Sequence, residues 1–232
     1  MNQNFLIELF YSLVIMVSCL IVYFKTDEIY KLTSHKGIKY FRITFLFFAV
    51  TYFLRFFTKI LVLGLIISGT RFNPMQLAEL TSLLLLYTGF MTTFYLLYGL
   101  SRKSFSRFLP ETTDALHVVA IVLSSVIIFF KLPMIFIAIT LSLLSYLLVV
   151  GYSNYRESRK KPHSQFYVVY FLLILFSMTN ILDTLIPNFF KTVQMLVYAF
   201  SISIFLVITY RVLKILSVES NGQQKKQVRD NL

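Results

Sequence analysis

Seven long apolar stretches run through this chain and constrain its fold more than any other feature. Each has 16 to 28 residues, and a helix needs roughly 20 mostly apolar residues to cross the hydrocarbon core of a bilayer. None of the stretches alternates between polar and apolar residues as a barrel strand does. The sequence therefore predicts an all-α, polytopic integral membrane protein with seven transmembrane helices, at residues 5–24, 41–68, 77–100, 115–130, 133–152, 166–187 and 192–213.

The composition excludes the common soluble classes. Hydrophobic residues make up 57% of the chain and charged residues 14%, whereas a soluble domain carries about 25% charged residues. So much apolar surface does not fit inside one water-soluble core of this size, which excludes an ordinary soluble enzyme and a disordered chain. The single cysteine, Cys19, excludes a disulfide framework, and we expect it to act as a small apolar packing residue.

The basic residues predict how the helices are oriented. Of the 22 Lys and Arg residues, seventeen lie in the connections and tail on one side, and two lie within spans. Only Arg71, Lys131 and Lys191 lie on the other side. By the positive-inside rule the N-terminus is outside and the C-terminus is cytoplasmic, in the cell membrane. We interpret the net charge of +12 as orientation and contact with anionic lipid headgroups on the cytoplasmic side, with no nucleic-acid partner.

The sequence predicts one membrane domain followed by a short extension. Residues 1–216 are predicted to form a single seven-helix domain, and residues 217–232 a short polar cytoplasmic tail. The tail is too short for a kinase or another folded output domain. Only Lys131 and Leu132 separate the fourth and fifth spans, which predicts a tight hairpin.

A possible internal repeat, called the internal echo below, appears when the chain is compared with itself at an offset of 128 residues. The offset superposes the first two spans on the fifth and sixth, and it aligns Phe48 with Phe176 and Arg55 with Asp183. Apolar matches arise easily in such a sequence. A true duplication is one reading, and it implies a 3+1+3 parallel repeat of the kind known in small transporters.

Ionisable residues inside the spans are the sharpest functional signal. They are Glu8, Arg55, Lys59, Glu79 and Asp183. Each charge inside a span costs about 2.5–3.5 kcal/mol on insertion scales, so it requires a partner or a polar cavity. The predicted topology places all five in the outer half of the membrane. Arg55 and Lys59 share one helix face because they are four residues apart.

Three interpretations of these charges remain open. They are structural ion pairs, or the lining of an outward-opening cavity for a small ligand or ion, or Lys59 extends to the headgroups while Arg55 pairs alone. Nearby polar residues, including Asn180, Gln194, Tyr52, Tyr87 and Tyr198, favour a polar cavity. The candidate ligand-binding residues are Glu8, Arg55, Lys59, Glu79, Asn180 and Asp183.

Motifs for most membrane enzymes are missing. The three histidines form no HxxxH or HExxH spacing, there is no CxxC, and there is no Walker A loop. Asp183 is the single aspartate in a span, so paired catalytic aspartates are absent. We therefore expect a protein that is not an enzyme and that uses no metal or cofactor.

The layout resembles two kinds of membrane protein. The cytoplasmic segment HKGIKYFR (residues 35–42) leads into FLFFAVTYFLRFF (residues 45–57) within seven closely connected spans. This organisation looks like the membrane-embedded sensor regions that precede histidine kinases, and it is similar to small uncharacterised archaeal membrane proteins. The outer charges, this receptor-like topology and the basic cytoplasmic face lead us to expect a seven-helix receptor-like or sensor-like module. It would bind a small ligand or ion in the outer half and signal to a separate cytoplasmic partner. The alternatives are a small transporter built from two three-helix repeats, or a structural membrane subunit.

Overall fold

The described part of the protein is a bundle of long helices, and it confirms the all-α prediction. The structure, a computed structural model, describes residues 3–33, 36–68, 74–100, 113–158, 164–185 and 191–230. Within these ranges there is no strand. The helices are α1 (Gln3–Thr33), α2 (Lys36–Ser68), α3 (Pro74–Leu100), α5 (Thr113–Phe129), α6 (Pro133–Ser158), α7 (Ser164–Leu185) and α8 (Lys191–Asp230).

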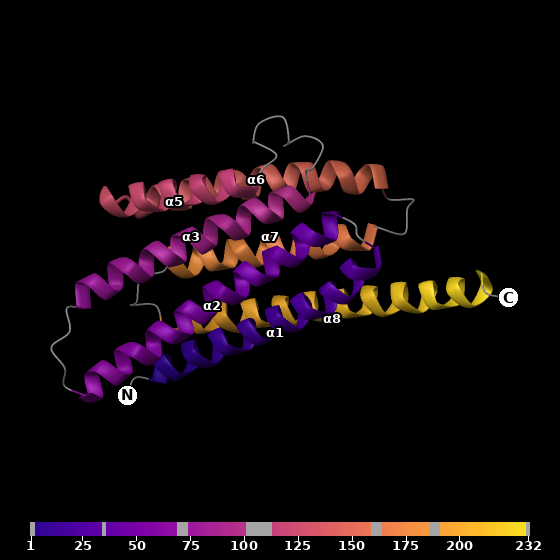
Figure 1. The fold of residues 1–232 in the computed structure, drawn as a ribbon. Coiled ribbons are helices and arrows are strands. Elements are labelled where there is room, and N and C mark those ends of the chain that lie inside the picture. Colours follow the sequence, from indigo (N-terminus) through magenta and orange to yellow (C-terminus); the bar gives the residue numbers. More distant parts are fainter. Residues whose placement is uncertain are drawn as a thin grey trace.

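The helices lie side by side along one direction, and the chain reverses at each end of the bundle (Figure 1). Five of them contain a stretch long and apolar enough to cross a membrane, within α1, α2, α3, α6 and α8. Two others contain shorter apolar stretches, Asp114–Phe129 and Val168–Asp183. The protein is therefore a multi-pass helical membrane protein, because a bilayer accepts only segments whose backbone bonds are satisfied internally.

Several helices extend beyond the apolar stretches that predicted them. Helix α3 begins at Pro74, because proline suits the first turn of a helix, where its missing N–H is not needed. Helix α8 is 40 residues long and continues through residues 217–230, which we expected to form a short polar tail. The last span and most of the tail are thus one continuous helix.

The predicted hairpin between the fourth and fifth spans is confirmed as a three-residue turn between α5 and α6. Lys131 has a left-handed backbone with φ of 52°. Its N–H donates to the carbonyl of Ile128 at 3.1 Å, and the N–H of Leu132 donates to Ile127 at 3.0 Å. These two bonds are the Schellman arrangement that ends many helices, and its left-handed position normally holds glycine. The end of the bundle that contains this turn, the start of α1 and the end of α7 is called the Lys131 end below (Figure 1).

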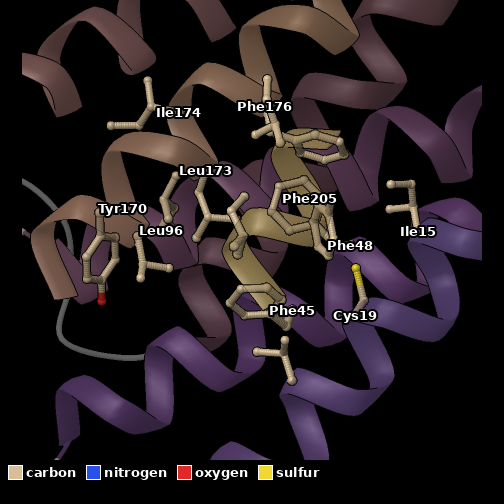
Figure 2. Close-up of a cluster of buried hydrophobic side chains, with 14 of the residues drawn as sticks. Ile15, Cys19, Phe45, Phe48, Leu96, Tyr170, Leu173, Ile174, Phe176 and Phe205 are labelled. Carbon is tan, nitrogen blue, oxygen red and sulfur yellow. The ribbon is translucent and has the colours of Figure 1, made fainter. Parts of the chain in front are cut away.

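Four phenylalanines form the centre of the core. Phe45 and Phe48 of α2 meet Phe176 of α7 and Phe205 of α8, and the rings of Phe176 and Phe205 lie 4.8 Å apart. Figure 2 shows Phe205 between Phe45, Phe48 and Phe176, with Cys19 of α1 beside them. Cys19 is fully buried, as expected for a packing residue.

Helix α2 divides its phenylalanines between the core and the outer surface. Phe45 is 0% exposed, whereas Phe53 is 49% and Phe57 is 46% exposed. Large apolar side chains are also exposed on α5 and α6, including Val118, Phe129 and Val149. Such a surface would drive aggregation in water, but it is the normal surface of a helix that faces lipid tails.

At the opposite end of the bundle, Arg42 joins α2 to α1. Its guanidinium pairs with Asp27, and its Cζ atom lies 5.3 Å from the ring centre of Tyr23 and 5.2 Å from that of Tyr30. Lys31 pairs with the same aspartate at 2.8 Å. The α1–α2 turn is thus held by charge and cation–π contacts as well as by packing.

We predict that Gly99→Ala weakens the bundle. A Cβ atom at Gly99 of α3 would lie 2.6 Å from the hydroxyl oxygen of Tyr170 and 3.4 Å from two atoms of its ring. Overpacking of this kind costs about 1–3 kcal/mol, so the midpoint of thermal unfolding of the detergent-purified protein should fall.

Gly64→Ala is the matched control. Gly64 also lies in a helix, but nothing stands within 4 Å of the position that a Cβ atom would occupy, so the unfolding midpoint should stay the same or rise slightly. Equal midpoints for the two variants would contradict the close α3–α7 contact.

Candidate ligand-binding site at the Lys131 end

Two ion pairs join α2 to its neighbours. Arg55 pairs with Asp183 of α7, with 3.6 Å between Nη1 and Oδ2. Lys59, one turn further along α2, pairs with Glu8 of α1. The Arg55 and Asp183 side chains are 29% and 12% exposed, whereas those of Lys59 and Glu8 are 43% and 21% exposed. The Arg55–Asp183 pair is therefore the more enclosed of the two.

A set of hydroxyl and amide groups continues these pairs into the bundle. The Tyr52 hydroxyl donates to Oδ1 of Asn180 at 2.5 Å. The Tyr11 hydroxyl lies 3.2 Å from the same oxygen and 2.9 Å from the Tyr52 hydroxyl, so it can donate to either. Tyr11 and Tyr52 are 3% and 1% exposed. Buried polar groups need such partners, and here one amide oxygen connects α1, α2 and α7.

Gln194 extends the network to α8. Its amide nitrogen donates to the Tyr198 hydroxyl at 2.9 Å and lies 3.4 Å from Oδ1 of Asp183. The ring of Tyr198 stacks on Tyr11, with 4.7 Å between the ring centres. The side chains of Glu8, Tyr11, Tyr52, Arg55, Lys59, Asn180, Asp183, Gln194 and Tyr198 are called the polar network below.

Residues 128 positions apart touch each other across this network. The rings of Phe48 and Phe176 are 5.5 Å apart, Tyr52 bonds Asn180 at 2.5 Å, and Arg55 pairs with Asp183 at 3.6 Å. A constant offset over two turns means that α2 and α7 run in the same direction and in register. The internal echo in the sequence therefore coincides with a set of real contacts.

A cavity of about 600 Å³ lies beside the polar network at the Lys131 end. Its walls come from α2, α3, α5, α6, α7 and the α5–α6 turn, and most of them are apolar. Three charged residues line it, namely Arg55, Glu79 and Lys131. Sites for small molecules have this size and this combination of apolar walls with a few polar groups.

Arg55 belongs both to the network and to the cavity wall. Its guanidinium carbon lies 5.5 Å from the ring centre of Tyr52, and the Asp183 contact at 3.6 Å is too long for a hydrogen bond. No hydrogen bond joins the guanidinium to any residue that the structure describes. An acceptor inside the cavity would thus meet guanidinium N–H groups that no described residue uses.

Thr140 of α6 adds an unused hydroxyl to the same wall. It is 6% exposed, and its Oγ1 atom has no hydrogen-bond partner among the described residues. Most other buried hydroxyls donate to the carbonyl four residues earlier, as Ser124 does to Ala120 at 2.7 Å. A buried polar atom without a partner costs about 1–3 kcal/mol, which a bound molecule with a matching group would recover.

The structure separates the six candidate residues into two groups. Arg55, Asn180 and Glu79 line the cavity. Glu8, Lys59 and Asp183 belong to the polar network but not to the cavity wall. Glu79 is exposed on α3 and forms no ion pair with the described residues, so it stands outside the network that holds the other five.

Sequence reasoning missed Tyr11, Lys131 and Thr140 as members of the site. Tyr11 follows Glu8 by three residues, so their shared helix face was a usable signal. Lys131 was counted as a loop cation, and its approach to the cavity depends on the turn geometry. No signal in the sequence distinguishes Thr140 from the other hydroxyl residues of the spans.

His117, outside this site, has partners at both ring nitrogens. Nδ1 lies 2.7 Å from the Tyr87 hydroxyl and Nε2 lies 3.3 Å from the Tyr95 hydroxyl. Tyr87, which we grouped with the outer charges, therefore belongs to this α3–α5 contact. In the described ranges no group of three His, Cys, Asp or Glu side chains is placed to hold a metal ion.

We predict that Arg55 and Asp183 depend on each other for stability. Arg55→Gln or Asp183→Asn alone leaves a charge without its partner inside the membrane, which should lower the free energy of unfolding by about 2 kcal/mol or more. The double variant should recover most of that loss, because both charges are gone. A double-mutant cycle on the purified protein measures the coupling.

The Glu8–Lys59 pair provides the comparison. Because the Lys59 side chain is 43% exposed, the coupling between Glu8→Gln and Lys59→Gln should stay below about 1 kcal/mol. A coupling at Arg55–Asp183 no larger than this would contradict the structural importance of that pair.

Comparison with known proteins adds a relative but no activity. No protein-family model matches the chain, and no solved structure does. An uncharacterised protein of Archaeoglobus fulgidus is 33% identical over 219 residues, which covers 89% of this chain and 91% of the relative. This agrees with the expected similarity to small uncharacterised archaeal membrane proteins, and nothing supports the resemblance to histidine kinase sensor regions. The chain belongs to the same family as this archaeal protein.

Proposed function

We propose that the protein is a receptor-like membrane module that binds a small ligand in the cavity and signals to a separate cytoplasmic partner. The observation that carries the proposal is the position of Arg55 and Asn180. Both line the cavity, and both also belong to the polar network that joins α1, α2, α7 and α8. A ligand that contacts these side chains acts directly on the contacts between four helices.

The proposed signal passes through Asp183 and Gln194. A ligand that draws Arg55 away from Asp183 weakens the α2–α7 pair, and Asp183 is also in contact with Gln194 of α8. Helix α8 continues to Asp230 at the opposite end of the bundle (Figure 1). A ligand shifts such an equilibrium only by its difference in affinity for the two arrangements, and Arg55 supplies that difference.

The orientation of the bundle is part of the proposal. The excess of basic residues supports an orientation in the cell membrane with the Lys131 end outside and the basic connections in the cytoplasm, against anionic lipid headgroups. The partner would then bind the basic cytoplasmic face.

Cysteine labelling tests this orientation. Lys131→Cys should react with a membrane-impermeant maleimide added to intact cells, whereas Glu28→Cys should react only after the cells are opened. Neither change weakens the positive-inside bias, because the first removes an outer cation and the second an acid. The unmodified protein, with Cys19 fully buried, is the background control. The reverse labelling pattern would overturn the orientation.

A cavity-filling variant tests ligand binding. A library of anionic, neutral and cationic small molecules is screened by thermal shift on the protein in lipid nanodiscs. At least one compound should stabilise the native protein, and Ser82→Phe or Ser177→Phe should abolish that shift, because both residues line the cavity.

Leu80→Phe is the control for this screen, because Leu80 is on α3 near Ser82 but does not line the cavity. The shift should persist in this variant. Absence of any compound whose effect depends on the cavity would refute the ligand-binding proposal and favour a structural membrane subunit.

A small transporter is the second candidate function. The in-register contacts between α2 and α7 favour it, because parallel repeats with a site at their interface are a transporter design. A transporter moves a bound compound across sealed liposomes, whereas a receptor binds it without flux. Flux of a cavity-dependent compound, lost in Ser82→Phe, would replace the receptor proposal with the transporter.

A further inference from the structure

The charges on the cavity wall favour a negatively charged ligand. Arg55 and Lys131 contribute two positive charges, and Glu79 contributes one negative charge. Asp183 neutralises part of the Arg55 charge from the side of the network, without lining the cavity. Counted over the lining residues alone, the wall carries one net positive charge, and with Asp183 the sum is zero. The preference for a monoanion over a cation therefore depends on Arg55 and Lys131 lining the cavity while Asp183 does not.

The arrangement around Arg55 favours a carboxylate as that charge. The planar guanidinium matches the two oxygens of a carboxylate, and paired N–H···O bonds of this kind are among the strongest in proteins. The Tyr52 ring lies 5.5 Å from the guanidinium carbon and holds it in a cation–π contact. Because Asp183 accepts no hydrogen bond from Arg55, an incoming carboxylate does not have to break one.

Lys131 occupies a position where the backbone favours glycine. A left-handed conformation costs an L-residue about 1–2 kcal/mol relative to the right-handed one. Lysine nevertheless stands there, with φ of 52°, at a turn that lines the cavity. Unfavourable backbone conformations of this kind are concentrated at functional sites, and here the residue adds a positive charge to the cavity.

The remaining walls favour an apolar body. Phe48, Phe136, Leu86, Ile127 and Ile181 line the cavity from α2, α3, α5, α6 and α7. The unpartnered hydroxyl of Thr140 offers one further hydrogen bond.

We propose that the cavity binds a small amphipathic monocarboxylate, with the carboxylate on Arg55, a long-range contribution from Lys131 and the apolar body against Phe48 and Phe136. The inference rests on the proposed ligand-binding function and gives the chemical class of its ligand. The same charge would be repelled by Glu79, which selects against molecules with a second acidic group.

Three matched probes test the class of ligand. They are 4-phenylbutyrate, 4-phenylbutanamide and 4-phenylbutylamine, which share an aromatic body and differ in charge. Binding to the protein in lipid nanodiscs is measured by calorimetry, with empty nanodiscs subtracted. The acid should bind about tenfold more tightly than the amide, since hydrogen bonds to a charged group contribute more than neutral ones. The amine should bind most weakly.

Paired double variants assign the preference to Arg55. Arg55→Gln with Asp183→Asn removes the cavity cation and its partner together, so the protein keeps its charge balance. Its preference for the acid should fall from about tenfold to about twofold, the share that Lys131 retains. Glu8→Gln with Lys59→Gln removes the neighbouring pair, which does not line the cavity, and should keep the preference for the acid. Lys131→Gln should reduce the preference about twofold, and Thr140→Val should weaken both probes equally.

Each other outcome counts against the proposal in a distinct way. Equal binding of acid and amide to the native protein, or tighter binding of the amine, would overturn the monocarboxylate and leave a ligand-binding cavity. An acid preference that stays near tenfold after loss of Arg55 and Asp183 would overturn the role of Arg55. Binding of none of the three probes would overturn the monocarboxylate, and the library screen with Ser82→Phe then decides the ligand-binding function separately.

Discussion

Compensation of charge inside an apolar bundle is the constraint on which the rest of the structure depends. Arg55 and Asp183 lie in largely apolar helices and are mostly enclosed by the bundle, and each charge is tolerable because the other is 3.6 Å away. The same faces of α2 and α7 that carry this pair also bring Tyr52 to Asn180 and Phe48 to Phe176 in the core.

Arg55 also connects the polar network to the cavity, because it belongs to both. The Asp183 contact satisfies the charge of Arg55 but none of its hydrogen bonds within the described residues. A guanidinium that retains its donors next to about 600 Å³ of unfilled, mostly apolar space is suited to bind an acceptor there. In the proposed function, stability and ligand binding share the Arg55 side chain, and a ligand bound there would act directly on the contacts between helices.

The in-register contacts also give the internal echo a physical meaning. When two parallel helices face each other at the same height, residues separated by a constant number of positions touch. Phe48–Phe176, Tyr52–Asn180 and Arg55–Asp183 all have a separation of 128 residues. An acid facing a base at equivalent positions is then a complementary pair, whereas two identical charges there would repel each other. Whether the two halves arose by duplication stays a hypothesis.

The sequence by itself determined the helices and the membrane class, because apolar length and backbone satisfaction in lipid depend on local composition alone. It also predicted the α5–α6 hairpin from the two residues between the spans, and five of the six candidate residues lie in the two ion pairs or in the Tyr52–Asn180 hydrogen bond. Only the tertiary structure decided which charges pair, that Glu79 stands apart, and that Tyr11, Thr140 and Lys131 belong to the site. The reason is that a helix surrounded by lipid is apolar on nearly all sides, so no polar stripe reveals which face points inward. Helix rotation and helix neighbours are set by packing between segments far apart in the chain, and the cavity is the space that this packing leaves.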